Sequence, residues 1–444
     1  MSNEYLDILE EDITDEAIKE FRYCEKDADQ SPGNLNVPSE LTISFQNEAA
    51  WMLPYKSYLI IEGTLMNADN NWTDANGTGI AFINNGLMYM FDTAKYFLGN
   101  QQIEYFQNCG VTTTMHNLLT KSSSYQGLQM MWYPDEHNGE ARNTNTGFAI
   151  RRDYLRNAAN SFKFSAIIPL SHIFSFANDY KKVIYGMQHK ISLQRQTDGK
   201  ALLKNNNAAD AAAVGNFEAG TAVAVANVGS IKITKLRWAM PTLILNTDAD
   251  LALTEIIKNK QPVSFSFLNK TYEFTAVPQS TVFTWKLQLA SGKQKPRYLV
   301  LGFQTGRTND QLTNNATFDP LNVLDAYVVL NTVRYPYAQV DTNLANNVYA
   351  KWYQNYLEFR KMYTGEDQGD SCLNLMTFKS ISTLYIFDVS HQPEQMTSSE
   401  TIDINVYMRF AENAAANTIA HMLTYSDSVY TLTGDGRKQL ISIL

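Results

Sequence analysis

Residues able to bind a metal ion gather in two short polar stretches. In PDEHNGE, His137 stands beside Asp135 and Glu136 and could join them around a metal. The loop from Asn67 to Gly77 offers side-chain oxygens of the kind that calcium prefers, on Asp69, Asn71, Asp74 and Asn76. Calcium takes about six to eight oxygens, and Asp74 stands where an EF-hand requires Gly. Asn and Asp at this density are typical of turns, so the sequence predicts no metal site and no cofactor.

The other polar motifs do not match those of known enzymes. GxSxG, HExxH, GxxxxGK[ST] and GxGxxG are all missing. GDGRKQ at 434–439 lacks the spacing of a phosphate-binding loop and is typical of a turn after a strand. His189 lies in the alternating run HKISLQR, which favours a hydrogen-bonded structural role, and His391 in DVSHQPE favours a turn. We therefore predict no catalytic residue and no enzyme; a cupin-like enzyme would need clustered His and carboxylate ligands on strands.

The cysteines and the apolar runs restrict where the chain is made. Cys24, Cys109 and Cys372 are odd in number and include no CxxC pair, which argues against a disulfide framework and against a zinc site. The sequence shows no N-terminal signal and no run of about eighteen apolar residues. It therefore predicts a protein made in soluble form in a reducing compartment, with no membrane-spanning segment.

Composition points to a folded protein rich in strands that does not bind nucleic acid through charge. Of 444 residues, 44% are hydrophobic, and the 25 Tyr and 22 Phe favour half-buried pleated surfaces. The net charge is −9, and Lys and Arg form no cluster longer than KK at 181 or GRK at 436. Non-specific binding to nucleic acid depends on such clusters, because their charges neutralise the phosphates. We therefore expect no basic tail that binds DNA and no sequence-specific recognition of nucleic acid.

The first 38 residues form an acidic N-terminal arm. Ile13, Ala17, Ile18 and Phe21 fall on one stripe and predict an amphipathic helix, which the turn-rich segment SPGNLNVP follows. An isolated helix of this length is marginally stable in water. We therefore expect the arm to dock either on its own chain or on a neighbouring subunit.

The first half of the chain reads as a series of strands with one hairpin and one helix. KYFLGNQQIEY at 95–105 is a hairpin signal, and TTTMHNLLTKSS after it predicts a helix opened by a Thr cap. An Ala/Asn/Gly-biased stretch at 198–228 predicts an insertion. Runs typical of strands are LTISFQ, SYLIIEGTL, GIAFINNGLMYMF, SFKFSAIIPLSHIF, VIYGMQHKISLQRQ and SIKITKLRWAMPTLIL.

The second half repeats this order after a short helix at Asp248–Lys260, for which Asp248 or Asp250 would supply the cap. A second hairpin signal, YVVLNTVRYPY from Tyr327, again precedes a helix, ANNVYAKWYQNYLEFRKMY. The apolar residues of that helix recur at spacings of three and four residues, namely Val348, Trp352, Tyr356, Phe359 and Met362. Strand runs are PVSFSFLNKTYEFTAV, STVFTWKLQLA, PRYLVLGFQTG, STLYIFDVS, TIDINVYMRF and AHMLTYSDSVYTL.

Matching pieces of the two halves lie about 190–230 residues apart, which indicates a duplication of a whole domain. We predict an all-β fold of two tandem eight-stranded jelly rolls, each with a short helix after an internal hairpin. The predicted parts are an acidic arm at 1–38, jelly roll 1 at 39–247 with its insertion at 198–228, and jelly roll 2 at 248–444.

Several long stretches resemble double jelly-roll major capsid proteins, above all those of Polinton-like elements and adintoviruses, including copies resident in animal genomes. FINNGLMYMFDTAKYFLGNQQIEY, IIPLSHIFSFANDYKKVIYGMQHKISLQR and KITKLRWAMP are similar to their first half. VPQSTVFTWKLQL, KPRYLVLGFQTGRTNDQ, VVLNTVRYPY and YIFDVSHQPE are similar to their second half. The similarity runs from about Glu40 to the end and is weakest in the arm and at 198–228.

The resemblance implies a structural, hexon-like capsid protein. Three copies would form a pseudo-hexameric capsomer, and capsomers would tile an icosahedral shell around double-stranded DNA together with a minor or penton capsid protein. The protein would be located in the virion. Two alternatives from other classes are a jelly-roll module that binds carbohydrate or a receptor, for which the loop at 67–77 is the motivating feature, and a cupin-like enzyme.

Overall fold

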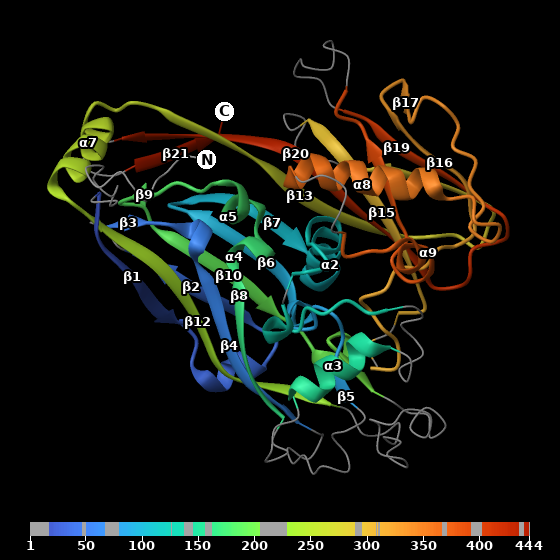
Figure 1. Ribbon diagram of the computed structural model, residues 1–444, viewed down its shortest axis with the longest axis horizontal. Coiled ribbons are helices and arrows are strands. Elements are labelled where there is room, and N and C mark those ends of the chain that lie inside the picture. The colour runs from blue at the N-terminus through green and yellow to red at the C-terminus, as the bar shows by residue number, and fades with distance from the viewer. Residues whose placement is uncertain are drawn as a thin grey trace, which may run out of the picture.

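The computed structural model describes residues 17–46, 50–66, 80–125, 127–136, 145–155, 162–204, 229–288, 295–307, 309, 311–365, 371–391, 402–434 and 439–443. Most of these residues lie in two β-sandwiches that follow one another along the chain (Figure 1). The statements below concern these residues.

The first sandwich has two four-stranded layers built from residues 18–245. One layer has the order β8 (Lys163–Pro169), β4 (Tyr58–Met66), β12 (Ser230–Leu245) and β1 (Ile18–Asp27), extended by the short β3 (Trp51–Met52) and β9 (Ile184–Tyr185). The other has the order β2 (Glu40–Phe45), β10 (His189–Arg195), β6 (Phe91–Leu98) and β7 (Gln101–Gln107). A small sheet pairs β11 (Leu202–Lys204) with β5 (Ile80–Phe82).

The second sandwich repeats both layers in the same order. One layer runs β18 (Leu384–Asp388), β15 (Pro296–Thr305), β20 (Thr418–Gly434) and β13 (Val263–Ala276), with β21 (Gln439–Ile443) on β20. The other runs β14 (Val282–Leu287), β19 (Ile404–Phe410), β16 (Val323–Leu330) and β17 (Val333–Tyr335). Eight strands arranged in this way form a jelly roll, so the predicted pair of tandem jelly rolls is confirmed.

The two hairpins that suggested a duplication occupy equivalent places. Leu98 pairs with Gln101 across the first turn, and Leu330 pairs with Val333 across the second. Each two-residue turn begins with a left-handed backbone, at Gly99 (φ 60°) and Asn331 (φ 52°), which Gly and Asn adopt most easily. A helix follows each hairpin, as expected: α2 (Cys109–Thr120) in the first jelly roll and α8 (Ala350–Thr364) in the second.

The remaining helices are short and sit in connections between strands. They are α3 (Thr146–Leu155), α4 (Leu170–Ile173), α5 (Ser175–Asp179), α7 (Thr247–Lys258) and α9 (Leu375–Ser380). Helix α7 joins the two jelly rolls at one end of the molecule, where the long strands β13 and β20 and the short strand β21 reach across the first jelly roll (Figure 1). The apolar interiors of both sandwiches and the space between them form one continuous cluster.

Three local predictions were wrong. Residues Ile18–Asp27 form strand β1, not a helix, because their backbone pairs with Arg237–Leu245 of β12 and this pairing overrides the helical spacing of the apolar residues. The cap of α7 is Asn246, whose side chain accepts a hydrogen bond of 2.8 Å from the Ala249 amide, rather than Asp248 or Asp250. Helix α2 starts at Cys109 after Asn108, without a side-chain cap from Thr.

The arm thus docks on its own chain from Ile18 onward, which is one of the two expected places, and it contributes a strand of the first jelly roll. The boundaries 1–38, 39–247 and 248–444 stay predictions. Of the predicted insertion at 198–228, Asp198–Lys200 forms a short 3-10 turn and β11 follows; residues 205–228 lie outside the described part of the chain.

Candidate functional site: the contact between the two jelly rolls

Among the described residues, those that the sequence offered for metal or catalytic chemistry do not form a common site. His137 and the loop 67–77 lie outside the described residues. Asp135 is buried and forms an ion pair of 2.7 Å with Arg151, while its second oxygen accepts a hydrogen bond of 2.8 Å from Asn314; Glu136 is exposed. Among the described residues, no three His, Cys, Asp or Glu side chains form a group that could hold a metal ion.

The other singled-out residues have structural positions. His189 is buried on β10, with its Nδ1 2.7 Å from the hydroxyl of Tyr96. His391 is exposed at a bend after β18, and its carbonyl accepts a hydrogen bond from Tyr335. The segment GDGRKQ joins β20 to β21, since Gly434 pairs with Gln439; residues 435–438 are not described. None of the three cysteines forms a disulfide.

What the structure does bring together is a set of polar and aromatic side chains between the two jelly rolls. At its centre Lys270 of β13 forms an ion pair of 2.8 Å with Glu104 of β7, and both side chains are fully buried. A buried charge must be paired and hydrogen-bonded to persist. This requirement makes the pair a fixed point between two strands that lie 166 residues apart in sequence.

Both charges have further partners that fix their positions. The Glu104 carboxylate accepts hydrogen bonds of 3.0 Å from the amides of Ser175 and Phe176, at the start of α5. Lys270 donates a second hydrogen bond, of 3.0 Å, to the Ser175 hydroxyl, and its Nζ lies 5.0 Å from the centre of the Phe106 ring. The pair therefore ties β13 of the second jelly roll to both β7 and α5 of the first.

Aromatic side chains extend this contact along β13. Phe265 packs on Tyr180 with ring centres 4.7 Å apart, and Phe267 packs on Phe176 at 5.8 Å. Tyr430 of β20 stacks on both phenylalanines and donates a hydrogen bond of 3.1 Å to the Ile103 carbonyl of β7. The Leu268 amide, on the free edge of β13, donates to Asp179 of α5 at 3.1 Å. Burial raises the pKa of Asp179.

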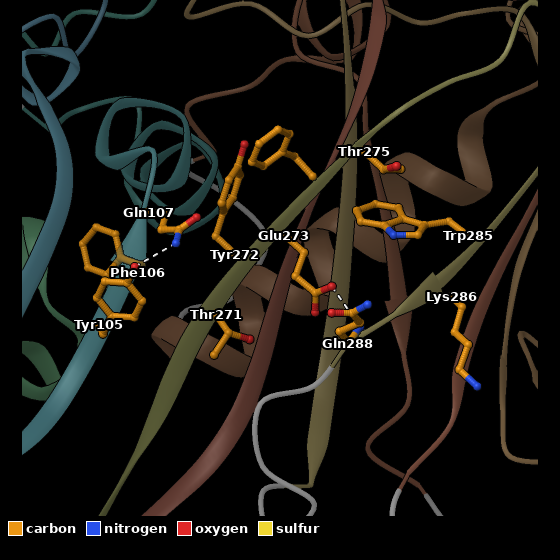
Figure 2. A pocket seen from close by; sticks show the side chains of 11 residues that line it. Tyr105, Phe106, Gln107, Thr271, Tyr272, Glu273, Thr275, Trp285, Lys286 and Gln288 are labelled. Atoms are coloured by element: carbon orange, nitrogen blue, oxygen red, sulfur yellow. Dashed lines mark hydrogen bonds between the residues drawn. The ribbon is translucent and has the colours of Figure 1, made fainter. Parts of the chain in front are cut away.

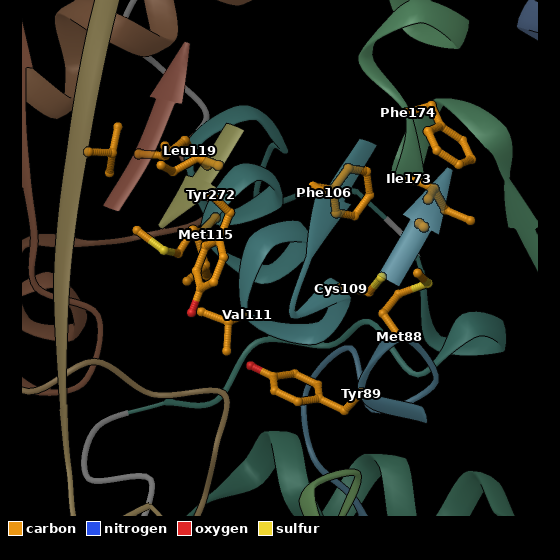
Figure 3. Close-up of a cluster of buried hydrophobic side chains, with 14 of the residues drawn as sticks. Met88, Tyr89, Phe106, Cys109, Val111, Met115, Leu119, Ile173, Phe174 and Tyr272 are labelled. Atoms are coloured by element: carbon orange, nitrogen blue, oxygen red, sulfur yellow. The ribbon is translucent and has the colours of Figure 1, made fainter. Parts of the chain in front are cut away.

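The helices that follow the two hairpins meet on the other side of the contact. Tyr356 of α8 donates a hydrogen bond of 3.2 Å to the Leu118 carbonyl of α2, and Arg360 donates to the carbonyl of Lys121. His116 of α2 lies 2.9 Å from the Tyr425 hydroxyl, and burial holds the pKa of this histidine well below its ordinary value. Helix α2 is buried along its whole length, packed among residues of both jelly rolls such as Met88, Phe106 and Tyr272 (Figure 3).

A groove with a volume of about 510 Å³ opens beside this contact (Figure 2). Its walls come from β7, β13 and β14, the outermost strands of three different sheets. Tyr105, Trp285 and the half-buried Glu273 line it; Glu273 accepts a hydrogen bond of 2.9 Å from the Gln288 amide, and burial raises its pKa. Among the described residues that line the groove, Glu273 is the one carboxylate, and Lys286 is the one basic side chain.

Sequence reasoning did not identify Lys270 and Glu104. Each lies within an alternating strand, in LNKTYEF and QQIEYF, and a charged residue inside such a run is a visible signal. The signal does not identify the partner, since the pairing depends on how two separate sandwiches stand against each other. The described residues contain no helix long and apolar enough to cross a membrane.

Comparison with known proteins agrees with this architecture. The family model for a double jelly roll-like domain matches residues 80–430. A chain of the Sputnik virophage structure superposes with a TM-score of 0.55 at 10% identity, over 100% of this chain and 92% of that one. The Faustovirus major capsid protein superposes with a TM-score of 0.53 at 8% identity, over 96% of this chain and 92% of that one. The mavirus major capsid protein superposes with a TM-score of 0.50 at 8% identity, over 95% of this chain and 90% of that one.

A search of curated proteins finds no match. The matches confirm the resemblance to double jelly-roll proteins and are consistent with the narrower likeness to Polinton-like elements and adintoviruses, which their descriptions do not name. Because the family model covers most of the chain, and both sandwiches have the same strand order, the chain belongs to the double jelly roll-like family.

Proposed function

We propose that the protein is a hexon-like major capsid protein, of which three copies form a pseudo-hexameric capsomer. The observation that carries this proposal is the contact between the jelly rolls, which joins two similar sandwiches side by side through a buried ion pair and aromatic packing. Three such chains around a three-fold axis present six similar units, so the outline of the trimer approaches a hexagon. Hexagons tile a surface, which is what a shell requires.

The chemistry of the described residues supports a structural role. The candidate metal ligand Asp135 is engaged with Arg151 and Asn314. The buried His189 and His116 are hydrogen-bonded to tyrosines. Burial lowers the pKa of His189 to about 3, so this imidazole is neutral near neutral pH and takes up no proton there. These groups stabilise the fold and are not exposed to a substrate.

We infer that capsomers of this kind assemble into an icosahedral shell around double-stranded DNA, together with a minor or penton protein at the vertices. The negative net charge of −9 argues that the shell confines DNA without binding it tightly. The protein would be made in soluble form inside the host cell and would be located in the virion.

The oligomeric mass tests the proposal. Size-exclusion chromatography with light scattering at micromolar concentration should give a stable particle of three times 50.2 kDa. Obligate interfaces bury on the order of 2,000 Å² or more and keep their partners together at such concentrations. A monomer that persists up to about 100 times that concentration would contradict the proposal.

The described surface includes a groove suited to the alternative function of carbohydrate binding. A carbohydrate-binding module would use an open groove with aromatic and polar walls, such as the one lined by Tyr105, Glu273 and Trp285. In that case a glycan array should show hits that Trp285→Ala abolishes. An array without hits, together with a trimeric mass, would eliminate the alternative. The loop 67–77 that first suggested it is not among the described residues.

A further inference from the structure

Two strands at equivalent places in the two jelly rolls differ sharply in burial. Strand β1 pairs with the long strand β12 as β13 pairs with β20, each at the end of its sheet. Within β13, Phe265, Phe267 and Lys270 are buried. Within β1, every residue except Cys24 is exposed. The difference needs an explanation, because a bare edge strand of ten residues invites uncontrolled pairing with other chains.

Strand β13 is buried because the first jelly roll covers it. Its free edge faces α5, where Leu268 donates to Asp179, and its side chains reach β7, where Lys270 meets Glu104. In the described part of the chain nothing covers β1 in this way, and β12 is its one strand partner. The surface that covers one strand within the chain therefore has no counterpart for the other.

The exposed side of β1 is suited to a specific contact. Phe21 and Tyr23 are 41% and 42% exposed, and their rings meet edge to face at 5.5 Å. Tyr23 also packs on Tyr58 of β4 at 5.2 Å, which continues the aromatic surface over the sheet. Arg237 holds Glu25 and Asp27 at the border of this surface through ion pairs of 2.6 and 2.8 Å. An aromatic centre with a charged border is typical of protein–protein interfaces.

The second jelly roll carries the element that would cover β1. Strand β17 occupies the place that β7 has in the first jelly roll, at the end of its sheet after the hairpin. Aligning the hairpins at Leu98 and Leu330 places Tyr337 where the first jelly roll has Tyr105. Tyr337 is 73% exposed and packs beside the buried Tyr335, with ring centres 5.5 Å apart.

We propose that β1 of one copy docks on the β17–Tyr337 side of the next copy's second jelly roll. This junction would repeat between chains the contact that β13 makes with β7 and α5 within a chain. It is head-to-tail, so it uses two different surfaces on each copy, and three copies related by a three-fold rotation would close into a ring. The proposal rests on the proposed function, since it names the surfaces that hold the capsomer together.

Substitutions on the two surfaces test the junction. Phe21→Asp with Tyr23→Asp, and separately Tyr337→Asp, should each raise the concentration at which trimers dissociate by about 100-fold or more, since aromatic anchors dominate interface energies. Val282→Asp is the matched control, because Val282 is 58% exposed on β14, at the opposite end of its sheet from β17. The control should leave the trimer intact, and circular dichroism should show that all variants are folded.

Mixing the variants tests the head-to-tail geometry. The β1 variant keeps an intact β17 side, and the Tyr337 variant keeps an intact β1, so an equimolar mixture should form dimers with one working junction and no closed trimers. A mixture that restores trimers, or that stays monomeric, would overturn the proposal.

Different results would contradict the proposed function and the proposed docking surfaces. A parent protein that is monomeric by light scattering would contradict the proposed function itself. A trimeric parent whose β1 and Tyr337 variants remain trimeric at the same dilution as the control would contradict only the assignment of surfaces and leave the capsid role standing.

Discussion

At the scale of single residues, the buried ion pair between Lys270 and Glu104 fixes how the two jelly rolls meet. Both side chains are inaccessible to solvent, and the carboxylate also accepts hydrogen bonds from the Ser175 and Phe176 amides. A pair of this kind adds little over a well-packed apolar replacement, but breaking it leaves an uncompensated charge. Its main contribution is to specify one arrangement of the two sandwiches.

Lys270→Met should lower the free energy of unfolding by about 3–5 kcal/mol, because it leaves the buried Glu104 carboxylate without its charged partner. Adding Glu104→Gln should restore part of that loss, because the double variant carries no buried charge. Denaturant unfolding of the four proteins in the cycle measures both effects.

The exposed pair of Lys286 and Asp403 is the matched control, with an N–O distance of 2.9 Å and side chains 69% and 45% exposed. Lys286→Met should cost less than about 1 kcal/mol, because solvent screens the interaction. Equal losses for Lys270→Met and Lys286→Met would show that the buried pair does not hold the jelly rolls together.

The buried histidines make stability depend on pH. Burial lowers the pKa of His189 to about 3 in the folded protein, whereas an unfolded chain has a histidine pKa near 6.5. Below about pH 6.5 His189 therefore binds a proton in the unfolded state but not in the folded state. The free energy of unfolding should fall with decreasing pH, by about 1.4 kcal/mol per pH unit for this residue between pH 6 and 4.

His189→Asn tests this sign, because an Asn side-chain amide can still form a hydrogen bond with the Tyr96 hydroxyl in either direction. The variant should lose stability overall but should show a shallower pH dependence, by about 1.4 kcal/mol per pH unit over that range. Urea unfolding at a series of pH values gives the slope. Parallel curves for the two proteins would mean that His189 is protonated in the folded state.

At the scale of elements, local sequence patterns were sufficient for most strands and for the helices α2, α7 and α8. Alternation of apolar residues located β2, β10 and β12, and Gly99 and Asn331 marked the hairpin turns. These features are encoded within a few residues of each other. Sequence reasoning was sufficient where the deciding interactions were local.

Elements whose conformation depends on distant partners were missed. The stripe of Ile18 and Phe21 suits a helix, yet pairing with β12, about 220 residues away, makes this segment strand β1. Helix α3 was not predicted, although its Arg151 forms an ion pair with Asp135. Strand β21 lacked a clear signal and forms on the edge of β20.

The cap of α7 shows that local sequence does not distinguish between neighbouring cap candidates. Asn246, Asp248 and Asp250 are all common cap residues, and only the structure shows that Asn246 accepts from the Ala249 amide while Asp250 accepts from the Trp51 indole at 2.8 Å. Asn246→Ala should lower the unfolding free energy by about 1 kcal/mol.

Asp248→Ala should cost only a few tenths of a kcal/mol, since it removes a charge near the helix start and no cap. Thermal unfolding of the two variants compares these effects. A larger loss for Asp248→Ala than for Asn246→Ala would assign the cap to the aspartate.

At the scale of the whole molecule, the duplication was visible in the sequence but the contact between the copies was not. The order of strands, hairpin and helix repeats along the chain, and this order predicts two jelly rolls. Neither Lys270 nor Glu104 points to the other in the sequence, because pairing across the contact requires both sandwiches to be folded and placed. The candidate site is therefore a property of tertiary structure.

The contact between the two jelly rolls also bears on how copies of the chain would assemble. A chain whose two sandwiches are locked together by Lys270, Glu104 and Tyr430 acts as one rigid block. Strand β1 and Tyr337 expose, at the two ends of that block, surfaces equivalent to those that are joined inside it. Under the proposed head-to-tail docking, repetition of this junction in three copies would give a closed ring.

Electron microscopy of the purified protein in negative stain would show whether three copies form a capsomer. We expect particles with a hexagonal outline and three-fold symmetry, in which six similar lobes come from three chains, with or without assembled shells. Single two-lobed particles at every concentration examined, or rings with another symmetry, would contradict it.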